Sequence, residues 1–238
     1  MTCPCCDNGN RIFVGSKDSH DLYRCTACSL IYVDPMPSNE ELSLFYQNYH
    51  KTTQYTGKLD SKLRRAKKRI RLVKWRVKGR RFVDVGCNVG FAVEAARRLG
   101  LESLGIDIDE SSIRLGKSLF PEAMLEIMSV QELAASGSTF DLIYCSEVIE
   151  HLLNPVEFVE ALSKILNNNG VLFLTTPDID HFSLPEDILS WDGVRPPEHL
   201  LYFSKKSLNA LLGGHGFGNV RFQFNLKPTL KVYARKSS

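Results

Sequence analysis

The stretch RFVDVGCNVGFAVEAARRLG, residues 81–100, decides the fold. An apolar run ends at Asp84, Gly86, Asn88 and Gly90 then follow at two-residue intervals, and a helical pattern of apolar residues comes next. This order predicts a strand, a tight turn and a helix, which is how a nucleotide-binding α/β unit begins. The first question is therefore which nucleotide-like ligand the turn holds.

The rest of the chain continues the same alternation of strand and helix patterns. Strands are expected at residues 81–85, 103–108, 124–128, 140–145 and 171–175, with helices between them. Such alternation predicts a parallel, doubly wound α/β sheet with helices on both faces. Its ligand is expected beyond the carboxyl ends of the strands.

The turn itself narrows the choice of ligand. Its spacing, G-x-N-x-G, does not fit the G-x-G-x-x-G that cradles a pyrophosphate, and no Gly-Lys-Ser/Thr follows as in a P-loop. Asp107 stands 21 residues after Gly86, where an acid can accept hydrogen bonds from both ribose hydroxyls. The ligand therefore has a ribose but needs no phosphate cradle, and S-adenosylmethionine meets that description.

Four cysteines near the N-terminus have the spacing of a metal site. Two C-x2-C pairs are separated by 18 residues, and they predict a structural zinc site with the ligands Cys3, Cys6, Cys25 and Cys28. A segment this short needs such a metal to fold. Cys5 is an alternative to Cys6, and unmetallated thiols are the alternative to zinc.

Composition and charge set the broad class. The 238 residues carry a net charge of +3 and are 43% hydrophobic, as expected for one large domain with a small appendage. We expect a zinc-binding module at 1–35, a helical connector at 36–79 and the nucleotide domain at 80–238. Without a signal-peptide pattern or an apolar run of membrane-spanning length, a cytoplasmic protein with reduced thiols is expected.

The connector ends in a strongly basic segment. Residues 58–81 contain 13 Lys or Arg and a single acid, Asp60, and their apolar residues follow a helical period. One interpretation is a solvated helix that packs its apolar stripe on the next domain. The other is a surface that attracts an anionic substrate, such as a nucleotide-linked sugar, a lipid-linked glycan or RNA.

Several ordered motifs resemble class I S-adenosylmethionine-dependent methyltransferases, in particular their ubiquinone-type and sugar-type branch. These motifs are DVGCNVG at 84–90, GIDID at 105–109, FDLI at 140–143, VIEHL at 148–152 and PEHL at 197–200. The four-cysteine module followed by DPMP at 34–37 also looks like that branch. The resemblance implies a Rossmann-like seven-stranded sheet whose last two strands, near 220–224 and 230–234, form an antiparallel hairpin.

The resemblance also implies roles for individual residues. Asp84 would hold the amino group of the cofactor's methionine part, and Gly86 would let that part pass close to the backbone. Asp107 would bind the hydroxyls of the ribose. Other expected cofactor contacts are Cys87, Asn88 and Gly90 in the turn, Ile108, Ser129 and Val130 around the adenine, and Cys145 and Glu147 near the methyl donor. The sequence departs from the common pattern at Asn88, where glycine is usual.

Methyl transfer to a hydroxyl usually needs a base, and histidine has the appropriate pKa. His199, with Glu198 beside it, is our candidate; a histidine that only bonds to the backbone is the alternative. Trp191, Tyr202 and Phe203 are expected to form aromatic walls for a sugar, and Tyr46 and Tyr49 could reach the acceptor. For His151 a structural role is expected.

The sequence therefore predicts a methyltransferase for a small-molecule acceptor. The expected acceptor is anionic or contains a sugar, namely a nucleotide sugar or a surface polysaccharide methylated on oxygen or carbon. An RNA methyltransferase, in which the zinc module and the basic helix would hold phosphates, is the first alternative. A non-catalytic scaffold that binds the cofactor is the second.

Overall fold

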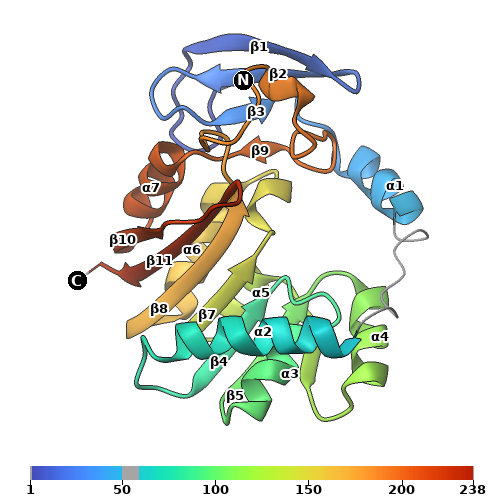
Figure 1. The fold of residues 1–238 in the computed structure, drawn as a ribbon, viewed down its shortest axis with the longest axis vertical. Helices are drawn as coiled ribbons and strands as arrows, with labels where there is room; N and C mark the ends of the chain where they lie inside the picture. Colours follow the sequence, from blue (N-terminus) through green and yellow to red (C-terminus); the bar gives the residue numbers. More distant parts are fainter. Residues whose placement is uncertain (1, 50–58, 238) are drawn as a thin grey trace.

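The computed structural model describes residues 2–49 and 59–237. These residues form a large sheet, covered by helices, and a small sheet at the opposite end of the molecule (Figure 1). The connector helix α1 (Asn39–Tyr49) begins with a capping box, since the amide of Glu41 donates to Ser38 Oγ at 3.2 Å and the amide of Ser38 to Glu41 Oε2 at 2.6 Å.

The large sheet has seven strands in the order β10-β11-β8-β7-β4-β5-β6. The pairs from β6 to β8 are parallel, whereas β11 and β10 join antiparallel at one edge. The strand order reverses between β4 and β7, so a crevice is expected at the ends of those two strands. The strands are β4 (Arg81–Val85), β5 (Glu102–Asp107), β6 (Met124–Ile127), β7 (Phe140–Ser146), β8 (Leu166–Pro177), β10 (Phe217–Gln223) and β11 (Thr229–Lys236).

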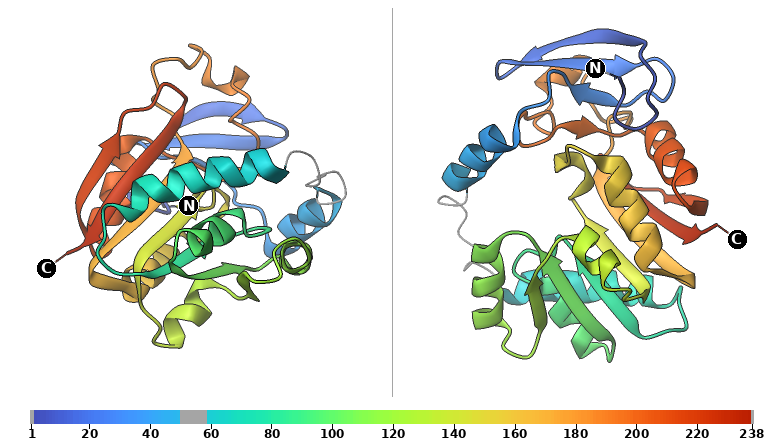
Figure 2. Two further views of the ribbon diagram at one scale, coloured as in Figure 1. Left: turned by 60° about the horizontal axis from the view of Figure 1, so that its bottom comes forward. Right: turned by 180° about the vertical axis from the view of Figure 1, so that it is seen from behind.

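Helices cover both faces of this sheet (Figure 2). On one face, Ile70 and Val73 pack with the alanines of the helix after β4 against Phe82 and Tyr144. On the other face, apolar side chains of two later helices pack against Ile143 and its neighbours. The helices are α2 (Leu59–Lys74), α3 (Phe91–Arg98), α4 (Glu110–Leu119), α5 (Val130–Ala135), α6 (Pro155–Ile165) and α7 (Lys205–Gly214).

The small sheet joins distant parts of the sequence. Its order is β1-β2-β3-β9, formed by β1 (Arg11–Lys17), β2 (His20–Cys25), β3 (Ile31–Val33) and β9 (Leu201–Tyr202). Ile31 pairs with Tyr202, so the N-terminal strands are fixed to the segment that carries His199. Two short 3-10 turns, η2 (Ile149–His151) and η3 (Ile188–Ser190), lie in the loops nearby.

The seven-stranded α/β sheet and its antiparallel C-terminal hairpin confirm the expected fold class. The largest difference in a strand start is that of β8, which begins at Leu166 rather than at residue 171. The register with β7 shifts between Leu166 and Val171, so the three asparagines lie in a bulge of this strand. None of the helices in the described ranges is both long enough and apolar enough to span a membrane.

Candidate functional site

The turn after β4 is built from left-handed backbone. Gly86, Asn88 and Gly90 have φ of 74°, 51° and 82°. A Cβ on Gly86 would lie 2.4 Å from Val148 Cγ2, so this position has no room for a side chain. Asn88 takes the left-handed conformation better than most residues, which is why the turn keeps its shape without glycine there.

Asp107, at the end of β5, closes this turn. Its Oδ2 accepts a hydrogen bond from the amide of Asn88 at 2.7 Å, and its Oδ1 accepts one from the amide of Asp109 at 2.9 Å. Burial raises the pKa of Asp107 above its usual value, while these amides oppose the rise. The side chain of Ile108 is 78% exposed beside this carboxylate, an uncommon position for a large apolar group.

A cleft of about 240 Å³ opens over the turn. Its walls include four of the expected residues, Asp84, Gly86, Cys87 and Asn88. The other lining residues are Lys62, Arg65, Ala66 and Arg69 of α2, Phe91 and Ala92 of α3, and Tyr144 and Ser146 of β7. Burial raises the pKa of Asp84 well above its usual range, and the charge of Asp107 adds to this effect.

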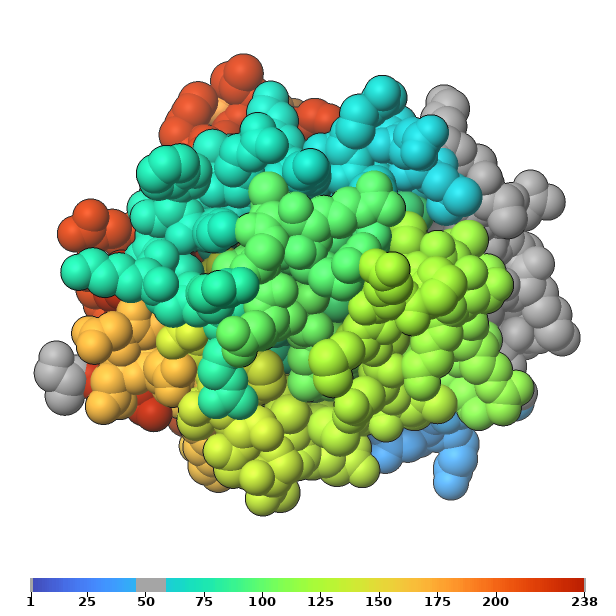
Figure 3. Space-filling model, turned by 90° about the horizontal axis from the view of Figure 1, so that it is seen from below, coloured from blue at the N-terminus to red at the C-terminus, as the bar shows by residue number. Residues whose placement is uncertain are grey.

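The cations on α2 are the part of the cleft that sequence reasoning missed. α2 lies beside α3 on one face of the molecule (Figure 3). Lys62, Arg65 and Arg69 follow each other at spacings of three and four residues, which places them on one side of the helix. That spacing was present in the basic segment, but thirteen cations in 24 residues hide which of them face a cleft.

The other expected cofactor residues do not line this cleft: Gly90, Asp107 and Ile108 belong to the turn and to the end of β5, and four more lie elsewhere. Ser129 caps α5, where its Oγ accepts from the amide of Glu132 at 3.2 Å, and Val130 is buried. Cys145 is fully buried on the other face of the sheet, and it is the neighbouring Tyr144 and Ser146 that line the cleft. Glu147 Oε1 accepts from Thr175 Oγ1 at 2.8 Å.

A buried cluster of Glu150, His151 and His199 lies close to the turn, joined to it through Val148. Nδ1 of His151 lies 2.6 Å from the carbonyl oxygen of Glu198, and Nδ1 of His199 lies 3.0 Å from that of Gly193. In both rings Nδ1 therefore donates and Nε2 carries the lone pair. One donor atom from each of the three side chains lies within 4.8 Å of the others, an arrangement able to hold a divalent metal ion.

The electrostatics of this cluster favour neutral groups. Burial, helped by His151 and Arg195, lowers the pKa of His199 to about 3. Burial also raises the pKa of Glu150 well above its usual range, and its Oε1 has no hydrogen-bond partner among residues 2–49 and 59–237. At neutral pH His199 is thus an uncharged hydrogen-bond acceptor.

The segment around His199 corrects one expectation. Tyr202 and Phe203 are 1% and 0% exposed, so they belong to the core and cannot form walls for a sugar. Glu198 Oε2 lies 3.2 Å from Arg195 Nε, and Arg195 NH2 lies 3.3 Å from His199 Nε2. The side chains of Tyr46 and Tyr49 lie outside the described part of the structure.

The cysteine pairs form two matching turns. The amide of Asp7 donates to the carbonyl of Cys3 and that of Ser29 to the carbonyl of Cys25, both at 3.0 Å, and both donor residues have positive φ. The Sγ atoms of Cys3, Cys6, Cys25 and Cys28 lie within 4.8 Å of one another, whereas Cys5 is outside this group. Four converging thiols of this kind could hold a metal ion.

Known proteins share both the sequence pattern and the fold. Over 100 residues, 40% of each chain, the protein is 35% identical to a ubiquinone biosynthesis O-methyltransferase of Parvibaculum lavamentivorans, so the match spans less than half of that relative. A SAM-dependent methyltransferase of Archaeoglobus fulgidus has the same fold, with a TM-score of 0.58 and 19% identity over 73% of this chain and 94% of that one. The N-terminal domain of EvdMO1 with SAH bound has this fold as well, with a TM-score of 0.57 and 17% identity over 85% of this chain and 98% of that one.

The sequence also matches the methyltransferase domain family over residues 53–221. This stretch contains the turn after β4, Asp107 and the whole Glu150–His151–His199 cluster. Because it covers well over half of the protein, the chain belongs to the methyltransferase domain family.

Proposed function

We propose that this protein transfers a methyl group from S-adenosylmethionine to the oxygen of a small-molecule acceptor. The observation that carries the proposal is the left-handed turn at Gly86–Gly90, closed by the carboxylate of Asp107 at the point where the strand order reverses. In open α/β sheets ligands bind at this point. The family match and the S-adenosylhomocysteine-bound fold neighbour support the same cofactor.

Within this proposal the cleft residues bind the methionine part of the cofactor, and the end of β5 beside the cleft binds its adenosine part. Asp84 accepts from the ammonium group of the methionine part, which passes over Gly86, Cys87, Asn88 and Gly90. Asp107 accepts from the ribose hydroxyls, and the exposed Ile108 contacts the adenine. Ser129, Val130, Cys145 and Glu147 stay predictions as cofactor contacts.

The α2 cations complete this assignment. A bound cofactor brings a carboxylate as well as an ammonium group, and Lys62, Arg65 and Arg69 line the cleft opposite Asp84. Guanidinium groups bind carboxylates through paired hydrogen bonds. The cations therefore suit the carboxylate, while Asp84 suits the ammonium group.

For catalysis we assign the base to His199, with Glu198 holding Arg195 beside it. In the free protein Nε2 accepts from Arg195 at 3.3 Å, and the acceptor hydroxyl would have to take the place of that donor to hydrogen-bond to the Nε2 lone pair. The low pKa of His199 makes this a weak base in the free protein, so its main contribution is to orient the hydroxyl. His199→Ala should lower kcat and leave the affinity for S-adenosylhomocysteine near that of the wild type; unchanged kcat would remove the assignment.

The acceptor class is tested by a methyl-transfer assay with labelled S-adenosylmethionine. The related Parvibaculum protein is named for ubiquinone biosynthesis, which favours phenolic hydroxyls and gives no support to sugar, polysaccharide or RNA acceptors. Catechols and nucleotide sugars should be compared at equal concentration. Turnover of a catechol supports the O-methyltransferase proposal, turnover of a nucleotide sugar restores the sugar prediction, and no turnover of any acceptor favours a scaffold.

The four clustered cysteines support a structural zinc site at Cys3, Cys6, Cys25 and Cys28. Four thiolates form a closed tetrahedral site, so the metal would stabilise the small sheet and take no part in chemistry. The division of the chain at residues 35 and 79, and a cytoplasmic location, stay predictions.

A further inference from the structure

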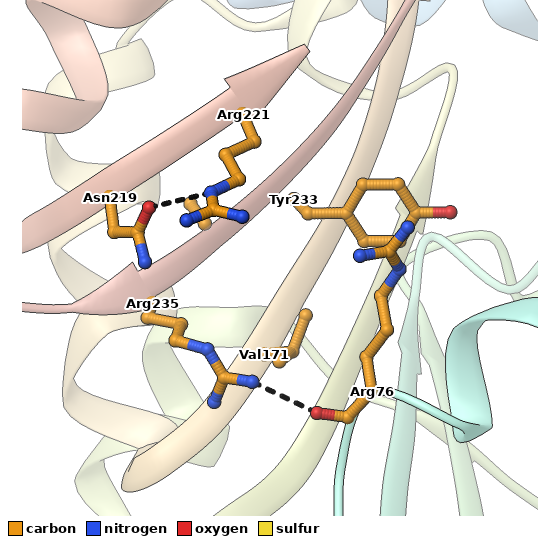
Figure 4. Close-up of a pocket in the computed structure, with 7 residues that line it drawn as sticks. Arg76, Val171, Asn219, Arg221, Tyr233 and Arg235 are labelled. Atoms are coloured by element: carbon orange, nitrogen blue, oxygen red, sulfur yellow. Dashed lines mark hydrogen bonds between the residues drawn. The ribbon is translucent and has the colours of Figure 1, made fainter. Parts of the chain in front are cut away.

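A second cavity, of about 290 Å³, lies at the other end of α2 (Figure 4). Its lining comes from β8, β10, β11 and the residues just after α2: Arg76, Val171, Asn219, Arg221, Tyr233, Ala234 and Arg235. Val171 is in register with Leu142, early in β7, and Leu142 is in register with Phe82, early in β4. The cavity is thus at the amino ends of the parallel strands, whereas the cofactor cleft is at their carboxyl ends.

Three guanidinium groups surround this cavity. Arg235 is held by the carbonyls of Asn169 and Arg76, each at 2.9 Å, and Arg221 Nε donates to Asn219 Oδ1 at 2.9 Å. The guanidinium of Arg76 lies over the ring of Tyr233, 3.9 Å from its centre. These contacts orient the three groups, of which Arg76 and Arg221 are exposed, and they use only part of the N–H donors.

The arginines of this cavity, Arg76, Arg221 and Arg235, form no ion pair with an acidic side chain in the described part of the chain. Like charges held close together repel each other, and a bound anion removes that cost. Oriented guanidinium groups without acidic partners are thus a ready-made anion site.

We infer that this cavity binds a small organic phosphate. The planar N–H forks of arginine match the geometry of a phosphate, and several of them suit a dianion better than the single charge of a carboxylate. The cavity volume is near the lower end for small-ligand pockets, so a phosphate with an organic part of moderate size fits. Val171 and Ala234 are only 2% and 1% exposed, so recognition rests on the three arginines rather than on apolar contact.

This assignment also divides the basic segment between two sites. Lys62, Arg65 and Arg69 face the cofactor cleft, whereas Arg76 faces the phosphate cavity. The inference does not rest on the proposed methyltransferase function, because none of the residues that line the two cavities is shared.

Calorimetric titration of the full chain tests the site. The probes are ribose 5-phosphate and inorganic phosphate, with ribose as the uncharged control, at low ionic strength and with S-adenosylhomocysteine present to fill the cleft. Wild-type protein should bind ribose 5-phosphate and phosphate but not ribose. Arg221→Gln and Arg76→Gln should each weaken binding about tenfold or more, because each removes charge-assisted hydrogen bonds. Arg114→Gln, which removes an exposed arginine of α4, should bind like the wild type.

Three results would overturn the inference: no phosphate binding at millimolar concentration, equal affinity in Arg221→Gln and Arg114→Gln, or a loss of binding in Arg69→Gln alone, which would put the anion in the cofactor cleft. Circular dichroism and thermal unfolding establish that each variant is folded. If the protein does not bind S-adenosylhomocysteine, the same titrations without it still test the cavity, so the two proposals fail separately.

Discussion

The carboxylate of Asp107 holds the backbone of Asn88, with 2.7 Å between Oδ2 and the amide nitrogen. The contact ties the end of β5 to the turn after β4, the two elements on which the cofactor would lie. One side chain therefore shapes the turn and also presents its oxygens to a ribose.

Asp107→Ala should weaken binding of S-adenosylhomocysteine roughly 100-fold, because two charge-assisted hydrogen bonds and the support of the turn are lost together. Isothermal titration calorimetry measures this affinity. Glu110→Ala removes an exposed acid three residues away and is the control, with wild-type affinity expected. Unchanged affinity in Asp107→Ala would remove the ribose assignment.

Asp84→Asn should stabilise the free protein above about pH 5 and weaken cofactor binding. An unfolded aspartate has a pKa of about 3.9, and burial raises the pKa of Asp84 well above that in the folded protein. Between the two values the folded protein binds more protons than the unfolded chain, so wild-type stability falls as the pH rises.

The asparagine side chain of the variant cannot bind this proton. Between the unfolded and the folded pKa of Asp84, the free energies of unfolding of the two proteins should therefore diverge by up to about 1.4 kcal/mol per pH unit. Urea unfolding at pH 5 and pH 7 measures the difference. Parallel curves for the two proteins would mean that Asp84 is not desolvated as the structure indicates.

Gly86→Ala should lower the free energy of unfolding by about 2–5 kcal/mol, since it adds a left-handed alanine and a clash with Val148. Gly137→Ala is the matched control: its φ of 73° is nearly the same, but nothing lies within 4 Å of the added Cβ. It should cost about 1–2 kcal/mol from backbone strain alone. Equal losses in the two variants would contradict the close packing at Gly86.

The protein should contain about one zinc ion per chain, measured by elemental analysis after gel filtration. Cys6→Ser should lose the metal, whereas Cys5→Ser should keep it, because only Cys6 has its Sγ among the other three thiols. A chelator should lower the melting temperature of the wild type, since the metal binds only the folded state. If Cys6→Ser kept the zinc ion and Cys5→Ser lost it, the fourth ligand would be Cys5 and not Cys6.

Much of the fold could be predicted because its signals are local. The turn at Gly86–Gly90, the cap at Ser38 and the hairpin after α7 are all specified by neighbouring residues, and the structure contains each of them. The start of β8 differed because Leu166 already pairs with Phe140 of β7, while the asparagines that follow bulge out of the strand.

Contacts between distant residues could not be predicted in the same way. β9 has only two residues, too few for a pattern, and only its pairing with β3 identifies it. Tyr202 and Phe203 looked like pocket walls, but the small sheet buries them. The Glu150–His151–His199 cluster joins segments 48 residues apart, a proximity that no spacing rule predicts.

A crystal structure of the protein saturated with S-adenosylhomocysteine would test the cofactor site without any assay. We expect the ligand in the cleft between α2 and the turn after β4, with its ribose hydroxyls on Asp107 and its amino group near Asp84. An empty cleft, or the ligand bound elsewhere, would refute the assignment of this cleft to the cofactor.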